Sequence, residues 1–400
     1  YLDIHYISTG GGNCAFGVLP DGTTMMVDAG ELDPTLPRTL SPRNTPRYPD
    51  WTKQCFEWQI DYIRSMFPTG REPVIDYAIV THYHADHFGG YHSGAPQSVH
   101  GDYCLSGITG VGDAIPIRML IDRGDDYPFN LRQAAKSHPA WAKSMENYWQ
   151  FIDTQARENG LMRETLAVGS KDQIVLRHAA AAYPAFNVRG INVNGVVWGG
   201  EGSTKDTCLL PDTIEVARTG AMPRENLLST GILLSYGPFR YYTAGDLLGT
   251  EPAYRGYRDW DDMESVVAPI VGRVDVTTAN HHGNRSSMTA NYLSVLRPRV
   301  IIQEVWSSDH PGHETLLRMT SKHLWPDDRD LFATNMLETN KLVIGPALTR
   351  AYKATEGHIV LRVMPGGEEY YVYSLNHRNT TREVTGKFGP YRAVRASTAP

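Results

Sequence analysis

The chain has 400 residues, of which 41% are hydrophobic and 20% are charged, so it can bury a large core and is too apolar for an intrinsically disordered protein. Its 38 Lys and Arg residues against 44 Asp and Glu residues give a formal net charge of −6, and no basic run offers a nucleic-acid footprint or an anionic-membrane surface. No segment approaches the roughly 18 apolar residues of a transmembrane helix, so we expect no membrane span.

The cysteines exclude two further classes of protein. None of the four lies in a C-x-x-C pair, which argues against a disulfide framework and against a thiolate zinc site: Cys14, Cys55, Cys104 and Cys208. The fifteen histidines are the unusual part of the composition. Because the net charge is negative, an anionic substrate would have to be held locally, by a metal ion or a few arginines.

The chain begins at Tyr1 in a strand-like segment, without an initiator methionine or a targeting segment. We therefore expect a mature chain whose leader has been removed, in the periplasm or secreted, and a cytoplasmic location is the alternative. Nothing in the sequence indicates an oligomeric state.

The first eighty residues alternate between strand and helix patterns. Residues 2–8, 14–20 and 23–28 read as strands separated by glycine-rich turns. Phe56, Ile60, Ile63 and Phe67 recur at the spacing of one helical face, which predicts a helix over 52–67 that ends before Pro68. An apolar run at 74–81 predicts a buried strand, and the alternation is typical of a layered α/β protein.

The rest of the chain continues this alternation without a linker that would divide it. We expect a helical cap inserted at about 128–170, strands at 173–178, 186–198, 228–236, 239–244, 272–279 and 299–305, and helices at 288–296 and 313–324. A hairpin at 357–364 and 369–374 follows. One domain over 1–375 and a C-terminal extension over 376–400 are therefore predicted.

The densest histidine cluster directly follows the predicted strand at 74–81. It reads Thr81-His82-Tyr83-His84-Ala85-Asp86-His87, before Gly89-Gly90. His82 and His84 point the same way in an extended segment because side-chain direction repeats every two residues. Asp86 and His87 can face a second ion from the following turn. Imidazole and carboxylate ligands suit zinc, and manganese or iron would also fit.

This H-x-H-x-D-H string resembles the signature of the metallo-β-lactamase superfamily. The opening glycines and the Asp28-Ala29-Gly30 turn look like the first strands of that family, and Thr243-Ala244-Gly245-Asp246 matches its metal-bridging aspartate. His281-His282-Gly283, with Asn226 and Ser229 before it and the segment 309–313 after it, is similar to one branch: the competence-type DNA-uptake hydrolases and phosphorylcholine esterases. The resemblance implies a four-layer αββα sandwich.

The resemblance also implies a ligand set. It places His82 and His84 on one metal, Asp86 and His87 on the other, and Asp246 between them. His282 would complete the second site, with His281 as a neighbour that orients or contacts substrate. One or two Zn²⁺ ions are expected.

A third histidine for the first metal is missing from the pattern. His92, His100, His138 and His178 are the intervening candidates, and none lies in a convincing motif. Oxygen ligation by Asp122 or Asp125 is the alternative, as is a first site that is weak or empty.

The function implied is that of a hydrolase that uses a metal-activated water on a phosphodiester or phosphate ester. Asp86 would steer the nucleophile, His313 would donate a proton or bind an oxyanion, and four side chains would contact substrate: Asn226, Asn284, Arg285 and Ser286. An acyl hydrolase for a lactam, lactone or thioester is the first alternative, because the fold alone cannot select a reaction. A metal-bearing binding protein without turnover is the second.

Overall fold

The computed structural model describes residues 1–134, 139–202, 205–207, 210–220, 222–251, 259–346 and 350–394. Its strands form two sheets, each with nine strands within the described residues. The first sheet has the order β18-β17-β16-β1-β2-β3-β4-β5-β6 and the second has the order β15-β14-β13-β12-β11-β10-β7-β8-β9. Cys208 and His138 lie outside the described residues.

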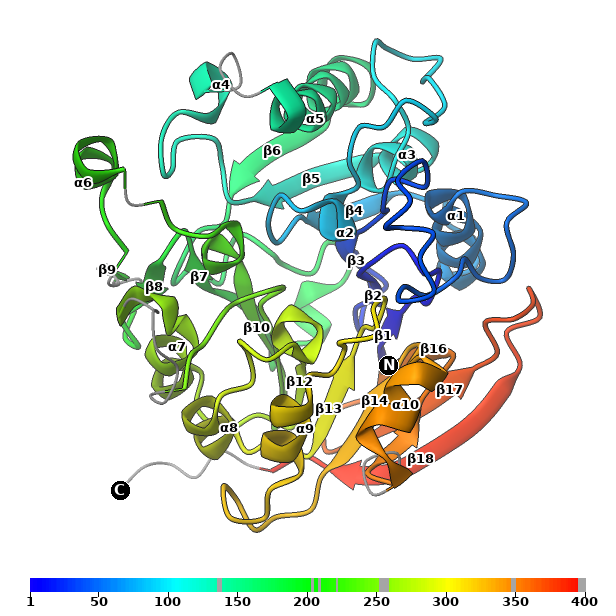
Figure 1. The fold of residues 1–400 in the computed structure, drawn as a ribbon. Coiled ribbons are helices and arrows are strands. Elements are labelled where there is room, and N and C mark those ends of the chain that lie inside the picture. Colours follow the sequence, from blue (N-terminus) through cyan, green and yellow to red (C-terminus); the bar gives the residue numbers. More distant parts are fainter. Residues whose placement is uncertain are drawn as a thin grey trace.

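The first sheet combines both ends of the chain. Its strands are β1 (Leu2–Tyr6), β2 (Cys14–Val18), β3 (Thr24–Ala29), β4 (Ile75–Ile79), β5 (Ile117–Asp122), β6 (Met162–Thr165), β16 (His358–Val363), β17 (Glu369–Leu375) and β18 (Val384–Arg392). β3, β4, β5 and β6 are parallel to one another, and the other neighbours are antiparallel. Figure 1 shows the red C-terminal strands beside the blue N-terminal ones.

The second sheet has the same division into a parallel and an antiparallel half. Its strands are β7 (Phe186–Val193), β8 (Val196–Trp198), β9 (Lys205–Thr207), β10 (Gly231–Tyr236), β11 (Phe239–Thr243), β12 (Val276–Thr278), β13 (Val300–Gln303), β14 (Asp330–Ala333) and β15 (Tyr352–Ala354). β11 to β15 are parallel in sequence order. The carboxyl ends of these strands therefore meet at one edge.

Helices cover the outer faces of the two sheets. The helices beside the first sheet are α1 (Cys55–Met66), α2 (Ala85–Phe88), α3 (Ile108–Ala114), α4 (Leu131–Ala134) and α5 (Pro139–Asn159). The helices beside the second sheet are α6 (Thr213–Thr219), α7 (Met263–Val271), α8 (Ala290–Leu296), α9 (His313–Thr320) and α10 (Glu338–Ile344). Figure 1 shows α1, α3 and α5 toward the upper right and α7, α8 and α9 toward the lower left. None of the helices in the described ranges combines the length and apolarity needed to cross a bilayer.

Three apolar clusters confirm the four-layer αββα sandwich. One cluster packs the two sheets together, with Ile4 and Tyr77 from the first sheet and Leu234 and Ile302 from the second. A second lies under α1, α3 and α5, and a third lies under α7, α8 and α9. Burial of these apolar side chains, at roughly 25 cal/mol per Å², holds the layers together. These are the layers that the resemblance to the metallo-β-lactamase superfamily implies.

The predicted helix at 52–67 is confirmed as α1. Phe56, Ile60 and Ile63 are buried on one face, and Pro68 follows the end of the helix. At its start, Gln54 N donates to Glu57 Oε2 at 2.7 Å, which satisfies a backbone group that the helix leaves unpaired.

The helix predicted within 128–170 is present as α5, but it is not a cap over the site. α5 connects the parallel strands β5 and β6 and packs on the outer face of the first sheet. Its apolar side chains, Met145, Tyr148, Trp149, Phe151 and Ile152, are buried in the cluster that α1 and α3 share. A crossover between parallel strands needs such a helix, so α5 belongs to the helical layer.

Two other predictions at strand level need correction. Residues 173–178 form no strand, because side chains elsewhere bind their backbone: Arg177 N donates to Thr23 Oγ1 and His178 N donates to Asp21 Oδ2. The strand predicted over 186–198 is a hairpin, turned at Asn194 and Gly195, which both have positive φ.

The boundary predicted near 375 separates β17 from β18, which pair in one sheet, so part of the expected extension completes the domain.

Candidate metal centre

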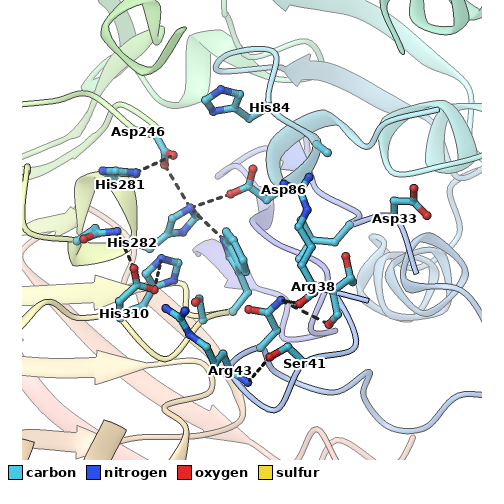
Figure 2. Close-up of a pocket in the computed structure, with 18 of the residues that line it drawn as sticks. Asp33, Arg38, Ser41, Arg43, His84, Asp86, Asp246, His281, His282 and His310 are labelled. Carbon is cyan, nitrogen blue, oxygen red and sulfur yellow. Dashed lines mark hydrogen bonds and ion pairs between the residues drawn. The ribbon is translucent and has the colours of Figure 1, made fainter. Parts of the chain in front are cut away.

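Four chain segments meet at the edge where the parallel strands of both sheets end. Residues 82–87 follow β4, Asp246 follows β11, His281 and His282 follow β12, and Trp306 and His310 follow β13. Figure 2 shows six of these side chains around one cavity: His84, Asp86, Asp246, His281, His282 and His310. The carboxyl ends of parallel strands are the usual place for a site in layered α/β proteins, because the loops there approach one another.

One group of four buried side chains can hold an ion. Asp86, His87, Asp246 and His282 each offer a ligand atom, and these atoms all lie within 4.8 Å of one another. Asp246 Oδ1 lies 3.0 Å from His87 Nε2 and 3.4 Å from His282 Nε2, and His282 Nε2 lies 3.0 Å from Asp86 Oδ2. The structure thus brings together the set predicted for the second metal.

A second group shares Asp246 with the first. His82, His84 and Asp246 also offer ligand atoms within 4.8 Å of one another. His82 Nε2 lies 3.0 Å from His84 Nδ1 and 3.7 Å from Asp246 Oδ2. His82 is fully buried whereas His84 is exposed. Asp246 therefore uses one carboxylate oxygen toward each group, which is the arrangement of a bridging ligand.

The contacts around His282 test whether a cation fits. Trp306 Nε1, which can only donate, lies 3.1 Å from His282 Nε2, and the Glu304 carbonyl oxygen, which can only accept, lies 3.1 Å from Nδ1. A neutral ring with its hydrogen on Nδ1 satisfies both neighbours, but its Nε2 lone pair then faces Asp86 Oδ2. Either a proton or a metal ion on Nε2 removes this repulsion: burial lowers the pKa of His282, but Asp246 and Asp86 outweigh it and raise that pKa, so a positive charge is favoured at this position.

Buried atoms without hydrogen-bond partners support the same conclusion. Asp246 Oδ1 and His87 Nε2 are buried and have no hydrogen-bond partner, although the two atoms lie 3.0 Å apart. Buried polar atoms without a partner are costly and call for an explanation. An ion pair with a protonated His87, or a divalent cation between the two atoms, accounts for them, and the donor set of the four-residue group fits such a cation.

The carboxylates and imidazoles shift one another's pKa values. Burial lowers the pKa of His87, but Asp246, Asp86 and Asp28 outweigh it and raise that pKa well above its usual value. Burial raises the pKa of Asp86 and of Asp246, and the neighbouring His87 and His282 outweigh it and lower both. Burial, with His87 next, lowers the pKa of His82. In the absence of a metal the cluster therefore holds charged carboxylates against a protonated His87.

The loop that carries His281 and His282 is strained and firmly anchored. Both residues have positive φ, 47° and 55°, which costs non-glycine residues of the order of 1–3 kcal/mol each. The buried carboxylate of Glu264 accepts hydrogen bonds from Asn280 Nδ2 at 2.8 Å and from Met288 N at 2.7 Å, one on each side of the loop. The backbone is thus held in a conformation that brings His282 into the cluster.

None of the described candidates for a third histidine of the first group reaches the cluster. His92 is buried and lies 3.9 Å from Asp33 Oδ1, His100 pairs with Asp113, and His178 Nε2 lies 3.7 Å from Asp76 Oδ2. His138 lies outside the described residues.

The alternative oxygen ligands are already occupied. Asp122 Oδ2 accepts from Arg163 Nε at 2.7 Å and from the Tyr148 hydroxyl at 2.8 Å, and Asp125 forms a two-point ion pair with the same guanidinium. Neither carboxylate is among the metal-binding groups found in the described residues. The first group therefore rests on His82, His84 and Asp246.

The histidine beside the cluster after β13 is His310, not His313. His313 is exposed at the start of α9 and does not line the cavity. His310 is buried, its ring stacks on His282 with centroids 4.5 Å apart, and its Nδ1 has no hydrogen-bond partner. His281 lies where we predicted a neighbour of the ligands, with Nε2 4.0 Å from Asp246 Oδ2. The five-residue string at 309–313 contained both histidines, and its register alone could not select one.

Of the four side chains predicted to contact substrate, two line the cavity and two do not. Asn226 and Asn284 line the cavity, and Asn226 Nδ2 lies 3.5 Å from Asp246 Oδ2. Arg285 is exposed and Ser286 is buried, and neither lines the cavity. Arg285 and Ser286 therefore do not lie where substrate contacts were predicted, because the turn after His282 directs them away from the cavity.

The cavity in front of the cluster has a volume of about 550 Å³. Its second wall is the loop between β3 and α1, including Leu36, Arg38 and Arg43, opposite Asp86 and His282 (Figure 2). The sequence did not predict this loop as part of the site, because the loop has neither a helical or strand periodicity nor a ligand motif. Trp306 and His310 were not predicted as part of the site either.

No family model and no curated protein matches the chain. Several solved structures are similar to it over most of its length. A mutant of the CmlA β-hydroxylase shares 10% identity over 84% of this chain, with a TM-score of 0.40, and the chain spans 52% of that protein. Zn²⁺-bound PqqB from Methylobacterium extorquens shares 12% identity over 91% of this chain and 100% of its own, with a TM-score of 0.41.

Unliganded yeast PDE1 shares 12% identity over 90% of this chain and 98% of its own, with a TM-score of 0.38. The fold assignment rests on the layers of the chain itself and on the placement of its His/Asp cluster.

Proposed function

We propose that the protein is a metal-dependent hydrolase that cleaves phosphodiesters or phosphate esters at a dinuclear centre. The observation that carries this proposal is that two donor groups share one buried carboxylate, Asp246. A shared carboxylate between two imidazole-rich groups is the arrangement that holds two divalent ions close together.

Zn²⁺ is the proposed metal. All six donor residues in the two groups are imidazole or carboxylate and no thiolate lies among them, which suits Zn²⁺ and would also accept Mn²⁺ or iron. Asp86, His87, Asp246 and His282 would hold one ion, and His82, His84 and Asp246 the other. Bound there, divalent cations supply Lewis acidity and make water a nucleophile at neutral pH.

The chain's own side chains would divide the remaining work. Asp86 is buried with a lowered pKa, so its carboxylate can orient an attacking water and accept a hydrogen bond from it. His310 would contact the leaving group from the other side of His282. Burial and the nearby His282 hold the pKa of His310 well below its usual value, so it acts as a neutral imidazole that donates one hydrogen bond.

The substrate assignment draws on the shape and polarity of the cavity. A volume of about 550 Å³ suits a small molecule or the end of a chain. The amide of Asn226 lies beside the cluster, where it can donate a hydrogen bond to an oxygen of the reacting group. The resemblance of the His281-His282-Gly283 segment to a branch that includes phosphate-ester hydrolases favours phosphorus over an acyl carbon.

A single assay series tests the proposal. The metal-loaded protein is analysed for metal content and then assayed with bis(p-nitrophenyl) phosphate, a thioester and a β-lactam. We expect close to two ions per chain and turnover of the phosphodiester, and Asp246→Ala should lose both. Asp113→Asn, which changes a carboxylate that pairs with His100 elsewhere, is the matched control.

Other outcomes would contradict the proposal in distinct ways. Hydrolysis of the thioester or lactam without any phosphodiester turnover would identify an acyl hydrolase. Metal content near zero together with inactivity on all substrates would favour a protein without turnover. Full metal content and activity in Asp246→Ala would show that this residue is not the bridge.

A further inference from the structure

The loop of residues 32–44 between β3 and α1 forms part of the wall of the cavity that also contains metal-binding residues. Two arginines of this loop, Arg38 and Arg43, line the cavity, and Figure 2 shows both among its lining side chains. Both are exposed, so their charged ends are available to a molecule that enters.

Backbone hydrogen bonds fix this loop to the segment that follows β13. Ser308 N donates to the Arg43 carbonyl oxygen at 2.7 Å, and Thr45 N donates to the Trp306 carbonyl oxygen at 2.9 Å. Asn44 Nδ2 donates to the Arg38 carbonyl oxygen at 2.8 Å, which ties the two arginines to one turn. The backbone at Arg38 and Arg43 is therefore held in place relative to Trp306, without help from their side chains.

The guanidinium groups of Arg38 and Arg43 have no protein partner among the described residues, in ion pairs or in hydrogen bonds. By contrast, Arg123 and Arg163 form close ion pairs with Glu225 and Asp122. The nearby carboxylates are otherwise engaged: Asp33 Oδ1 accepts from Thr35 N, and Asp309 Oδ2 accepts from Asn284 Nδ2. Two unpaired guanidinium groups, carried on an anchored backbone and lining one cavity, are suited to a phosphate, to which a guanidinium donates paired hydrogen bonds.

We propose that Arg38 and Arg43 bind a second phosphate of the substrate, remote from the ester bond that the metal centre cleaves. The inference rests on the proposed function and extends it: the preferred substrates are phosphoesters that carry an additional phosphate group. Because the protein has a net charge of −6, recognition of such a multiply charged anion depends on these local cations and not on the overall field.

A matched pair of substrates tests the inference. Thymidine 5′-(p-nitrophenyl phosphate) and its 3′-phosphorylated form differ only in the second phosphate. We expect the metal-loaded protein to have a higher kcat/KM for the 3′-phosphorylated ester. In the double variant Arg38→Gln and Arg43→Gln, that preference should fall by about 10- to 100-fold, the usual size of losing charge-assisted contacts.

The control variant is Arg157→Gln, on the outer surface of α5, which should leave the preference unchanged. Absence of a preference in the unaltered protein, or its retention in the double variant, would overturn the inference. Thermal melting of the double variant checks folding, which should be unaffected because the loop contacts are made by backbone groups and Asn44.

A binding measurement separates this inference from the proposed function. Calorimetric titration of the metal-loaded protein with thymidine 3′,5′-bisphosphate requires no turnover. If neither ester is hydrolysed, the proposed phosphodiesterase function fails, while a binding constant reduced at least 10-fold in the double variant still supports the arginine site. Equal binding by the unaltered protein and the double variant would overturn the arginine site even if both esters are hydrolysed.

Discussion

His87 Nδ1 donates a hydrogen bond to Asp28 Oδ2 over 2.8 Å, and this bond turns His87 Nε2 toward Asp246. Asp28 is itself fixed, because its two oxygens accept from Thr81 N at 2.7 Å and Thr81 Oγ1 at 2.8 Å. It stands at the end of β3 with a φ of 59°, uncommon for a non-glycine residue. A carboxylate behind a ligand imidazole sets the tautomer and increases the basicity of the ligating nitrogen.

Asp28→Asn should therefore weaken metal binding without unfolding the protein. Asparagine keeps the size of the side chain and tolerates the left-handed backbone, but it removes the negative charge behind His87. We expect the metal dissociation constant to rise about 10- to 100-fold, the usual effect of losing such a partner. Competition with a chromogenic chelator measures it.

Asp113→Asn is the control for this prediction, because Asp113 also pairs with a histidine, His100, and neither residue belongs to a metal-binding group among the described residues. Its metal affinity should equal that of the unaltered protein. An unchanged affinity in Asp28→Asn would mean that His87 does not need its carboxylate partner to bind the metal.

His84→Ala should halve the metal content and not abolish it. The group containing Asp86, His87, Asp246 and His282 has four buried donors and does not use His84, whereas the group containing His82 depends on it. Metal analysis after dialysis should therefore give about one ion per chain in His84→Ala. His282→Ala should also keep about one ion per chain, but the ion that remains is then the more weakly held one, which a chelator removes at a lower concentration than the ion left in His84→Ala. Equal resistance to the chelator in the two variants would contradict this ranking of the groups.

The metal-donor residues could be predicted from the sequence because they lie in short motifs. His82, His84, Asp86 and His87 lie within six positions after a buried strand, and one turn of chain is enough to direct them to one place. Asp246 and His282 were predicted differently, through the resemblance of their short strings to the metallo-β-lactamase superfamily. The spacing within the chain did not by itself place them beside residues 82–87.

The residues of the cavity wall could not be predicted from the sequence, because this wall depends on packing between distant segments. The loop with Arg38 and Arg43 meets the cluster only because Thr45 and Ser308 exchange backbone hydrogen bonds with residues of the other segment. The helix α5 has a polar side that suggested a cap, but its apolar face completes a layer whose extent is set by the sheet. Such choices depend on tertiary contacts that short patterns do not encode.

His310→Ala and His313→Ala should differ strongly in activity. His310 stacks on His282 inside the cavity, whereas His313 is exposed on α9. We expect kcat/KM for bis(p-nitrophenyl) phosphate to fall about 100-fold in His310→Ala with metal content preserved, in the range typical of losing one hydrogen-bond donor to the charge that develops in the transition state. His313→Ala should stay within about twofold, so the two variants act as controls for each other. The opposite ranking would restore His313 as the functional residue.

Away from the metal centre, two buried histidines should make stability depend on pH. Burial lowers the pKa of His5 to about 4, against the opposing effect of Asp3, and it lowers the pKa of His377 to about 4, against that of Glu356. His5 Nδ1 bonds to the Tyr62 hydroxyl, and His377 stacks on Tyr48 with centroids 3.9 Å apart. Both rings are therefore neutral in the folded protein at neutral pH.

The sign of the effect follows from the protons that each state binds. An unfolded histidine has a pKa of about 6.5, so between pH 6.5 and 4 the unfolded chain binds more protons than the folded one. The free energy of unfolding is thus greatest above pH 6.5 and falls as the pH drops toward 4, by up to about 3 kcal/mol for each ring. Urea unfolding at a series of pH values measures this slope.

His377→Phe should reduce the pH dependence of the free energy of unfolding by the contribution of about one bound proton, because phenylalanine keeps the stack on Tyr48 but cannot titrate. Ser8 Oγ, which bonds to His377 Nδ1, still has the Thr334 carbonyl oxygen at 3.3 Å, so the substitution leaves no hydroxyl without a partner. His323→Gln, at an exposed position after α9, should leave the slope unchanged. Since His377 is far from the metal donors along the chain and stacks in another cluster, metal content should stay the same in both variants. A slope that is identical in His377→Phe and in the unaltered protein would mean that the ring is already protonated in the folded state, contrary to the effect of its burial.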